Sequence, residues 1–149
     1  MTAPARRAAQ EVIRAVNTQR DDLANALDRA RRSLADPRDR ALVNDITLGV
    51  FRWRAALDHV LQQLSSRPLS SIDAAVLDIL RASIYQLLYL TRVPGHAIVA
   101  DAVALTRESR VDRASGFVNA ILRTLAEERR SVSLPTPPSC TTGWPVDRT

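Results

Sequence analysis

The sequence is poor in the residues that disulfide bonds, redox centres and membrane spans require. Cys140 is the only cysteine, which excludes an internal disulfide bond, a cysteine-cluster metal site and a redox pair. No apolar run approaches the roughly 18 residues that a membrane span needs, and no apolar segment follows the arginines near the N-terminus. We therefore expect a soluble protein of the reducing cytoplasm that has no membrane partner.

The residue patterns of common catalytic and cofactor sites are also missing. His59 and His96 are the only histidines, and neither has a Cys or another His at the spacing of a metal site. The sequence contains no phosphate-binding loop, no glycine-rich dinucleotide turn and no Ser-His-Asp arrangement. Cys140 follows Pro-Pro-Ser in a proline-rich segment, which argues against its use as a nucleophile. We predict that the protein is not an enzyme and binds no metal or cofactor.

Lysine is absent, so all 21 basic residues are arginines, and the formal net charge is +5. Arginine has a planar group that donates two parallel hydrogen bonds to a phosphate, which favours an anionic partner such as RNA. A GC-rich genome would produce the same bias, because it encodes arginine in place of lysine. Composition alone leaves both explanations open.

The scarcity of glycine, aromatic and β-branched residues, together with abundant alanine, leucine and arginine, indicates a helical protein. Apolar residues recur at helical spacing through most of the chain, and prolines interrupt them where new segments begin. We predict an all-α bundle of about six or seven helices. The expected helices begin near Pro4, cover residues 22–34, 37–64 and about 72–90, and end with a pair that starts near His96 and Ala114.

Single residues refine this plan at three places. The longest predicted helix contains Gly49, which costs about 1 kcal/mol relative to Ala and indicates a close helix crossing or a kink. Before the next helix, Ser70 and Asp73 have the spacing of a capping box. Within that helix, Tyr85 and Tyr89 lie one turn apart, and such a pair more often packs in a core than stacks on bases.

The helical pattern stops after Arg130. Residues 134–149 are rich in proline and show no periodicity, so we expect a disordered or linker-like tail. The 149 residues are enough for one domain with a substantial core, which we assign to residues 1–133.

Two stretches have an unusually specific pattern. One reads VP-x-HAxVxxAVxLxR followed by ASGFVNAxLRxL, in residues 93–125, and the other reads LVNDITLGVFRWRAALDHVL, in residues 42–61. Together they resemble the NusB-like domain. This domain occurs alone as a transcription antitermination factor and also as the N-terminal domain of bacterial 16S rRNA cytosine-5 methyltransferases. The resemblance covers roughly residues 4–130 and implies a helical, RNA-binding domain.

The two branches of this family give two interpretations of the function. Arg52-Trp53 and the GFVNAILR run are more similar to the methyltransferase branch, whereas the length is that of the stand-alone factor. Ala100-Asp101 stands where the family usually has Asn-Glu. We expect a non-catalytic RNA-binding protein of the NusB type, acting in transcription antitermination or rRNA handling. The alternative is a truncated N-terminal RNA-recognition domain of an rRNA methyltransferase.

The first predicted helix carries the main RNA-binding candidates. Arg7, Gln10 and Arg14 share one face, Arg6 lies beside them, and the apolar stripe occupies the other side. We expect these side chains to be solvent-accessible, to contact phosphates and to be dispensable for folding. A charged face that serves only solubility is the alternative.

Further candidates lie on the last two helices. Arg113, Ser115 and Asn119, at the start of the last helix, place amide donors and a positive helix end near an RNA backbone. The resemblance also implies docking of a small ribosomal protein, for which we name His96, Val99 and Asp101 on the preceding helix. A protein-protein adaptor is therefore the second alternative function.

Overall fold

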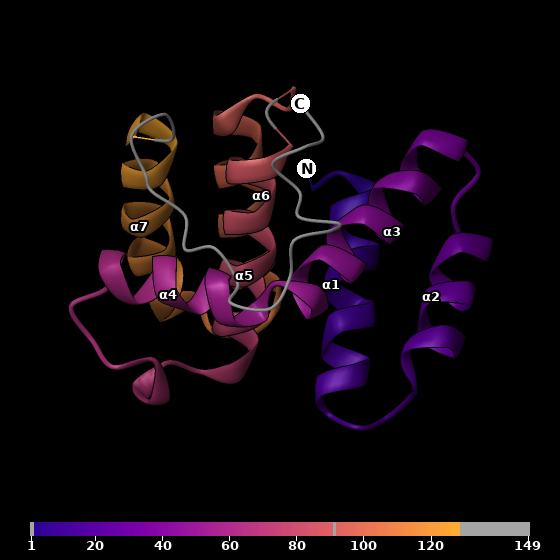
Figure 1. Ribbon diagram of the computed structural model, residues 1–149, viewed down its shortest axis with the longest axis horizontal. Coiled ribbons are helices and arrows are strands. Elements are labelled where there is room, and N and C mark those ends of the chain that lie inside the picture. The colour runs from indigo at the N-terminus through magenta and orange to yellow at the C-terminus, as the bar shows by residue number, and fades with distance from the viewer. Residues whose placement is uncertain (1, 91, 129–149) are drawn as a thin grey trace.

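The computed structural model describes residues 2–90 and 92–128, and this part of the chain is helical, without a strand (Figure 1). Its seven α-helices confirm the predicted all-α bundle. They are α1 (Pro4–Asn17), α2 (Leu23–Arg32), α3 (Pro37–Arg52), α4 (Arg54–Leu64), α5 (Ala74–Tyr89), α6 (Gly95–Glu108) and α7 (Ser115–Glu128), with short 3-10 helices η1 (Leu69–Ser71) and η2 (Asp112–Ala114). The predicted tail, 134–149, lies outside the described residues. None of the described helices is both long and apolar enough to cross a membrane.

The core of the bundle surrounds α5, as the nearly continuous apolar pattern of that helix predicted. Every residue from Val76 to Leu87 except Leu77 is buried. α5 contacts α1, α3, α4, α6 and α7. In Figure 1, α5, α6 and α7 stand side by side with α4 across them, and α1, α2 and α3 form the other half. The central helix therefore joins the two halves.

The prediction of one continuous helix over residues 37–64 is wrong, because the helix breaks at Trp53. This residue has φ −111° and ψ 23°, outside helical values, and separates α3 from α4. The new direction of α4 leaves Trp53, Leu57, Val60 and Leu61 all buried in the core. Each helix keeps an apolar stripe at helical spacing, so the periodicity alone does not reveal the break.

Gly49 marks a close crossing of α3 and α5. A Cβ atom at this position would lie 2.2 Å from Cζ of the Tyr85 ring, so any larger residue would collide with that ring. The predicted close crossing is confirmed, whereas the change of direction occurs at Trp53. Tyr85 is buried and its ring centroid lies 5.2 Å from that of Tyr89, which confirms that this pair packs in the core. Burial also raises the pKa of Tyr89 to about 12.

Aspartate side chains cap the starts of α2, α3 and α5. Before α5, the carboxylate of Asp73 accepts a hydrogen bond from the backbone N–H of Ala75 at 2.9 Å. The predicted capping box is wrong, because Ser70 lies in η1 and Asp73 itself is the capping residue. A single side-chain acceptor at this position is enough to satisfy one of the free N–H groups of the first turn.

Candidate nucleic-acid interface

Two of the predicted site residues, Arg6 and Asp101, bind each other. Nη1 of Arg6 lies 2.6 Å from Oδ2 of Asp101, and its Nε donates to Oε1 of Gln86 at 2.7 Å. Asp101 also accepts from the backbone N–H of Ala3 at 3.2 Å. The side chains of the pair are only 10% and 11% exposed, so the charge of Arg6 is neutralised inside the bundle.

Arg14 is held in a similar way by α5. Its Nη1 lies 2.8 Å from Oδ2 of Asp78, a side chain that is only 3% exposed. The same carboxylate accepts from Nδ2 of Asn17 at 2.8 Å and lies 3.5 Å from Nη1 of Arg81. Arg81 in turn pairs with Asp58 of α4 at 2.7 Å. These contacts form a buried ion-pair network that fixes α1 and α4 to α5.

The expected solvent exposure of the first helix is therefore wrong for Arg6 and for Gln10, which are largely buried. For Arg6 we expect a role in stability, since removing one partner of a buried ion pair leaves the other charge uncompensated. Arg7 differs from them. Its Nη2 lies 2.7 Å from Oε1 of Glu108, and the two side chains are 42% and 45% exposed. The hydrogen bond to Glu108 raises the pKa of Arg7 above its ordinary value.

Arg7, Gln10 and Arg14 line one hollow between α1 and the end of α6, which we call the α1 hollow. It is a depression open to solvent with a volume of about 620 Å³. Its remaining lining residues are Glu11, Ala15, Arg20, Asp21, Arg29, Leu105, Glu108 and Ser109. Four arginines thus face three acidic residues, and the hollow is only mildly basic. The structure confirms that the predicted stripe shares one face, although most of its charge is compensated.

A second group of arginines contains the predicted Arg113 together with Arg107 and Arg110, which were not predicted from the sequence. Arg107, Arg110 and Arg113 surround the junction of α6 and α7, and we call them the α6–α7 corner. All three are exposed, and none forms an ion pair with a residue in the described part of the chain. Arg110 has φ 64°, in the left-handed region that favours glycine. The signal in the sequence was the recurrence of arginine every third residue.

The start of α7 places only part of the second predicted site at the surface. Arg113 lines a hollow of about 260 Å³ together with Arg67, whose guanidinium lies 4.1 Å from the centre of the Phe117 ring. Ser115 begins α7 and is half-buried, as is Asn119 one turn further on. Arg113 and Arg67 are therefore the accessible groups here, and Arg67 was also missed.

The residues predicted for protein docking do not form one exposed surface. His96 is exposed in the first turn of α6, whereas Val99 packs in the core. Asp101 is buried against Arg6.

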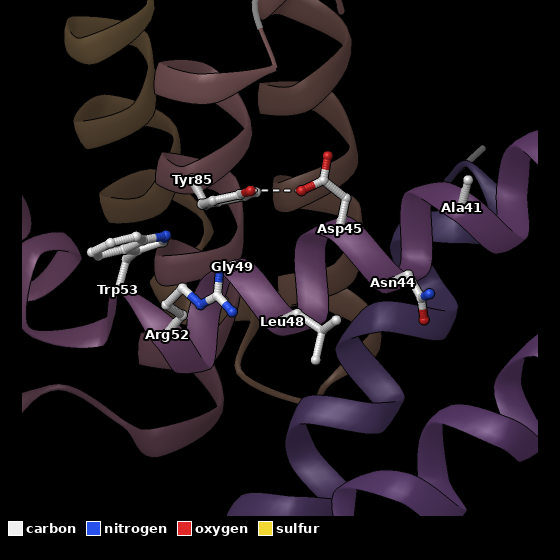
Figure 2. Close-up of a pocket in the computed structure, with 8 residues that line it drawn as sticks. All are labelled: Ala41, Asn44, Asp45, Leu48, Gly49, Arg52, Trp53 and Tyr85. Atoms are coloured by element: carbon white, nitrogen blue, oxygen red, sulfur yellow. Dashed lines mark hydrogen bonds between the residues drawn. The ribbon is translucent and has the colours of Figure 1, made fainter. Parts of the chain in front are cut away.

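A groove along α3 is lined by part of the LVNDITLGVFRW motif. Figure 2 shows Tyr85 of α5 over Gly49, with its hydroxyl directed at Asp45, whose carboxylate accepts its hydrogen bond at 2.6 Å. The groove encloses about 340 Å³ and also has the exposed side chains of Leu48 and Arg52. No group of three or more possible metal ligands occurs anywhere in residues 2–90 and 92–128.

Comparison with known proteins places this geometry in a family. Residues 3–127 match the NusB family. A ribosomal RNA small subunit methyltransferase B of Pseudomonas putida is 35% identical over 123 residues, which are 83% of this chain and 28% of that protein. The protein of the same name in Xanthomonas campestris is 39% identical over 123 residues, which are again 83% of this chain and 28% of that protein. A Mycobacterium tuberculosis protein named as a methyltransferase is 41% identical over 126 residues, 83% of this chain and 27% of that protein.

The chain thus spans little more than a quarter of the length of these relatives. The family match itself covers almost all of the described residues, from α1 to the last turn of α7. The seven-helix bundle and the GFVNAILR run on its last helix agree with that match. The chain belongs to the NusB family.

Proposed function

We propose that this chain is an RNA-binding domain that takes part in the handling of small-subunit ribosomal RNA in the cytoplasm. Support comes from relatives that are named as ribosomal RNA methyltransferases. The Arg52-Trp53 pair and the GFVNAILR run, which are similar to the methyltransferase branch, favour the same role. Stand-alone antitermination is the weaker alternative, because the similar proteins reported above carry methyltransferase names.

The observation that carries this proposal is the α6–α7 corner. Arg107, Arg110 and Arg113 are exposed and have no acidic partner among the described residues. Such guanidinium groups attract the phosphates of RNA, and each contact releases condensed counterions from the RNA backbone. Arg67 adds a fourth exposed guanidinium beside Arg113. A single-stranded RNA that crosses this corner would therefore meet several free positive charges.

The proposed interface continues from the corner to the α1 hollow, because Glu108 and Ser109 at the end of α6 line that hollow. Within it, Arg7 is the arginine of α1 that an RNA backbone reaches most easily, since its partner Glu108 is exposed. Arg6 and Arg14 hold α1 in place and position the interface. Ser115 and Asn119 contribute through the start of α7.

The proposed role of this domain is binding without catalysis. Its described part corresponds to a family of helical domains that makes up little more than a quarter of the methyltransferase relatives. We assign methyl transfer to the remaining portion of those relatives and RNA positioning to this portion.

A protein-protein adaptor has less support. A docking surface for a small ribosomal protein would use His96, Val99 and Asp101, and the last two are buried. A protein partner that binds through an apolar surface would show little dependence on salt, whereas RNA binding would weaken steeply.

The test is the binding of the full chain to fluorescein-labelled single-stranded RNA, measured by anisotropy at salt concentrations from about 50 to 200 mM. The affinity is expected to fall with salt. Each phosphate contact contributes about 0.7 to the log-log slope, so replacing Arg107, Arg110 and Arg113 by Gln should reduce the slope by about 2.

The matched control replaces Arg31, Arg38 and Arg54 by Gln, because these arginines are also exposed but lie on α2, α3 and α4. The net charge changes equally in both variants. Equal losses in the two variants would show that RNA responds only to total charge and would contradict the assigned interface. Absence of salt-dependent binding in the unmodified chain would overturn the proposed function itself.

A further inference from the structure

Gln10 is a buried polar residue that the fold itself does not explain. It lies in α1 and is only 6% exposed. Neither Oε1 nor Nε2 of its side chain has a hydrogen-bond partner among the residues that the structure describes. Leaving a buried donor and acceptor unpaired is unfavourable, and native proteins leave few such groups. The unpaired amide at this position can therefore accept hydrogen bonds from, and donate them to, a partner that is not part of the described chain.

Gln10 is one of the residues that line the α1 hollow, although neighbouring atoms cover both polar atoms of its amide in this structure. Arg7 and Arg14 lie one turn before and one turn after it on the same face of α1, and all three line the hollow. Leu105 of α6 contributes an apolar side chain to the same wall, and Arg20 contributes an exposed guanidinium. A volume of about 620 Å³ falls within the range of roughly 300–1,000 Å³ typical of ligand sites.

The hollow can open at little cost. The Arg7–Glu108 pair bridges α1 and α6 at its edge, and both side chains are more than two-fifths exposed. Exposed ion pairs of this kind contribute at most about 1 kcal/mol, so a ligand can displace Glu108 and take over Arg7. The buried pairs of Arg6 and Arg14 meanwhile keep α1 itself in place.

We propose that the α1 hollow receives a single unstacked nucleobase of RNA, whose edge pairs with the carboxamide of Gln10. This inference rests on the proposed RNA-binding function. A carboxamide offers one donor and one acceptor side by side, which matches a base edge, and Gln is a known reader of adenine. Leu105 and the guanidinium planes of Arg7 and Arg14 supply surfaces on which a base stacks.

The acidic residues of the hollow favour a base over an isolated phosphate. Glu11, Asp21 and Glu108 would repel a phosphate placed among them, and Oε1 of Gln10 is an acceptor that cannot donate to it. A neutral base has no such repulsion. Arg20 and Arg29, which also line the hollow, are then left for the phosphates on either side of the inserted nucleotide, which links recognition of the base to recognition of the backbone.

The experiment compares the unmodified full chain with Gln10→Leu in binding to single-stranded decamers of adenylate, cytidylate and uridylate. The unmodified chain is expected to discriminate between the best and worst decamer by about tenfold, the effect of one good bidentate base contact. Gln10→Leu should lose this discrimination and keep its salt slope, because Gln10 contacts no phosphate. Its melting temperature should stay equal or rise, since an unpaired buried amide has been replaced by an apolar group of similar size.

Matched controls separate this role from a structural one. Gln63→Leu changes an exposed glutamine of α4 in the same way and should keep the discrimination. Gln10→Met provides a second apolar replacement with a more flexible side chain. If both Gln10 variants fail to fold, Gln10 stabilises the bundle itself and the inference is overturned.

The outcomes distinguish this inference from the proposed function. Salt-dependent binding with discrimination that Gln10→Leu abolishes supports both. Salt-dependent binding without discrimination, or with discrimination that survives Gln10→Leu, overturns base insertion and leaves the RNA-binding function standing. Binding that is absent or independent of salt in the unmodified chain overturns the proposed function, and base insertion with it.

Discussion

The arginines of α1 and those of the α6–α7 corner have the same chemistry but opposite surroundings. Arg6 and Arg14 each meet a carboxylate that the bundle buries, at 2.6 and 2.8 Å. Arg107, Arg110 and Arg113 meet none in the described part of the chain and remain exposed. A basic residue therefore contributes to stability in the first region and is available to an anionic ligand in the second.

This difference shows why the net charge of a chain does not by itself predict where an anionic ligand binds. The net charge of +5 describes the whole chain, but a ligand responds only to the charges that are not already compensated. The arginine-rich helix α1 is therefore not the most accessible basic surface of the domain. Variants of the two regions should separate folding from binding, and the following predictions are ordered by the expected size of their effects.

The largest effect is expected for Asp78→Ala. This change removes the carboxylate shared by Arg14, Asn17 and Arg81, and it leaves Arg14 without its ion-pair partner and the buried Arg81 with Asp58 alone. We expect a loss of about 4 kcal/mol in the free energy of unfolding, measured by urea denaturation. Asp28→Ala, which removes an exposed partner of Arg32, should cost less than about 1 kcal/mol. A similar small loss for both would show that the buried network does not stabilise the bundle.

Arg6→Gln and Arg7→Gln should separate two neighbours on the same helix. The first leaves Asp101 buried without its cation, and we expect it to lower the free energy of unfolding by about 2–3 kcal/mol. The second breaks an exposed pair and should lower it by less than about 1 kcal/mol. Urea denaturation monitored by circular dichroism measures both. Equal stability losses would contradict the distinction between buried and exposed arginines in α1.

The smallest effect on stability, and one of opposite sign, is expected for Arg110→Gly. With φ 64°, an arginine at this position carries a backbone strain of about 1 kcal/mol that glycine lacks. The free energy of unfolding should therefore rise by about that amount. If Arg110 contacts RNA, the same change should flatten the salt slope by about 0.7.

Gln19→Gly is the matched control for Arg110→Gly, because Gln19 has φ 59° at the end of α1. Gln19→Gly should raise the free energy of unfolding by a similar amount without changing the salt slope of RNA binding. If Arg110→Gly binds RNA with an unchanged slope, the arginine at this strained position has no role in binding.

The sequence predicted the helical composition, the number of helices and the central place of α5, because apolar periodicity records which face of each helix is buried. It also predicted the crossing at Gly49, since a glycine inside a helix is unfavourable unless another element packs closely against it. The break at Trp53 was not predictable from periodicity, which continues on both sides of it. One residue outside helical values is enough to redirect a helix without changing that pattern.

The candidate site was less predictable than the fold. Arg7, Gln10 and Arg14 do share one face of α1, as their spacing indicated. Whether such residues are exposed depends on what the rest of the chain places opposite them, and local spacing contains no such information. The lack of a hydrogen-bond partner for Gln10 was also not predictable from local spacing, because only the assembled bundle buries this side chain.

The long separation between α1 and its partners also determines the order in which the bundle can be completed. Arg6 pairs with a carboxylate 95 residues later in the chain, and Arg14 with one 64 residues later. A ribosome that makes the chain from its N-terminus releases α1 long before α6 exists. α1 can pack on α2 and α3 early, but its ion pair with Asp101 must wait for α6, so these non-local ion pairs form among the late steps of folding.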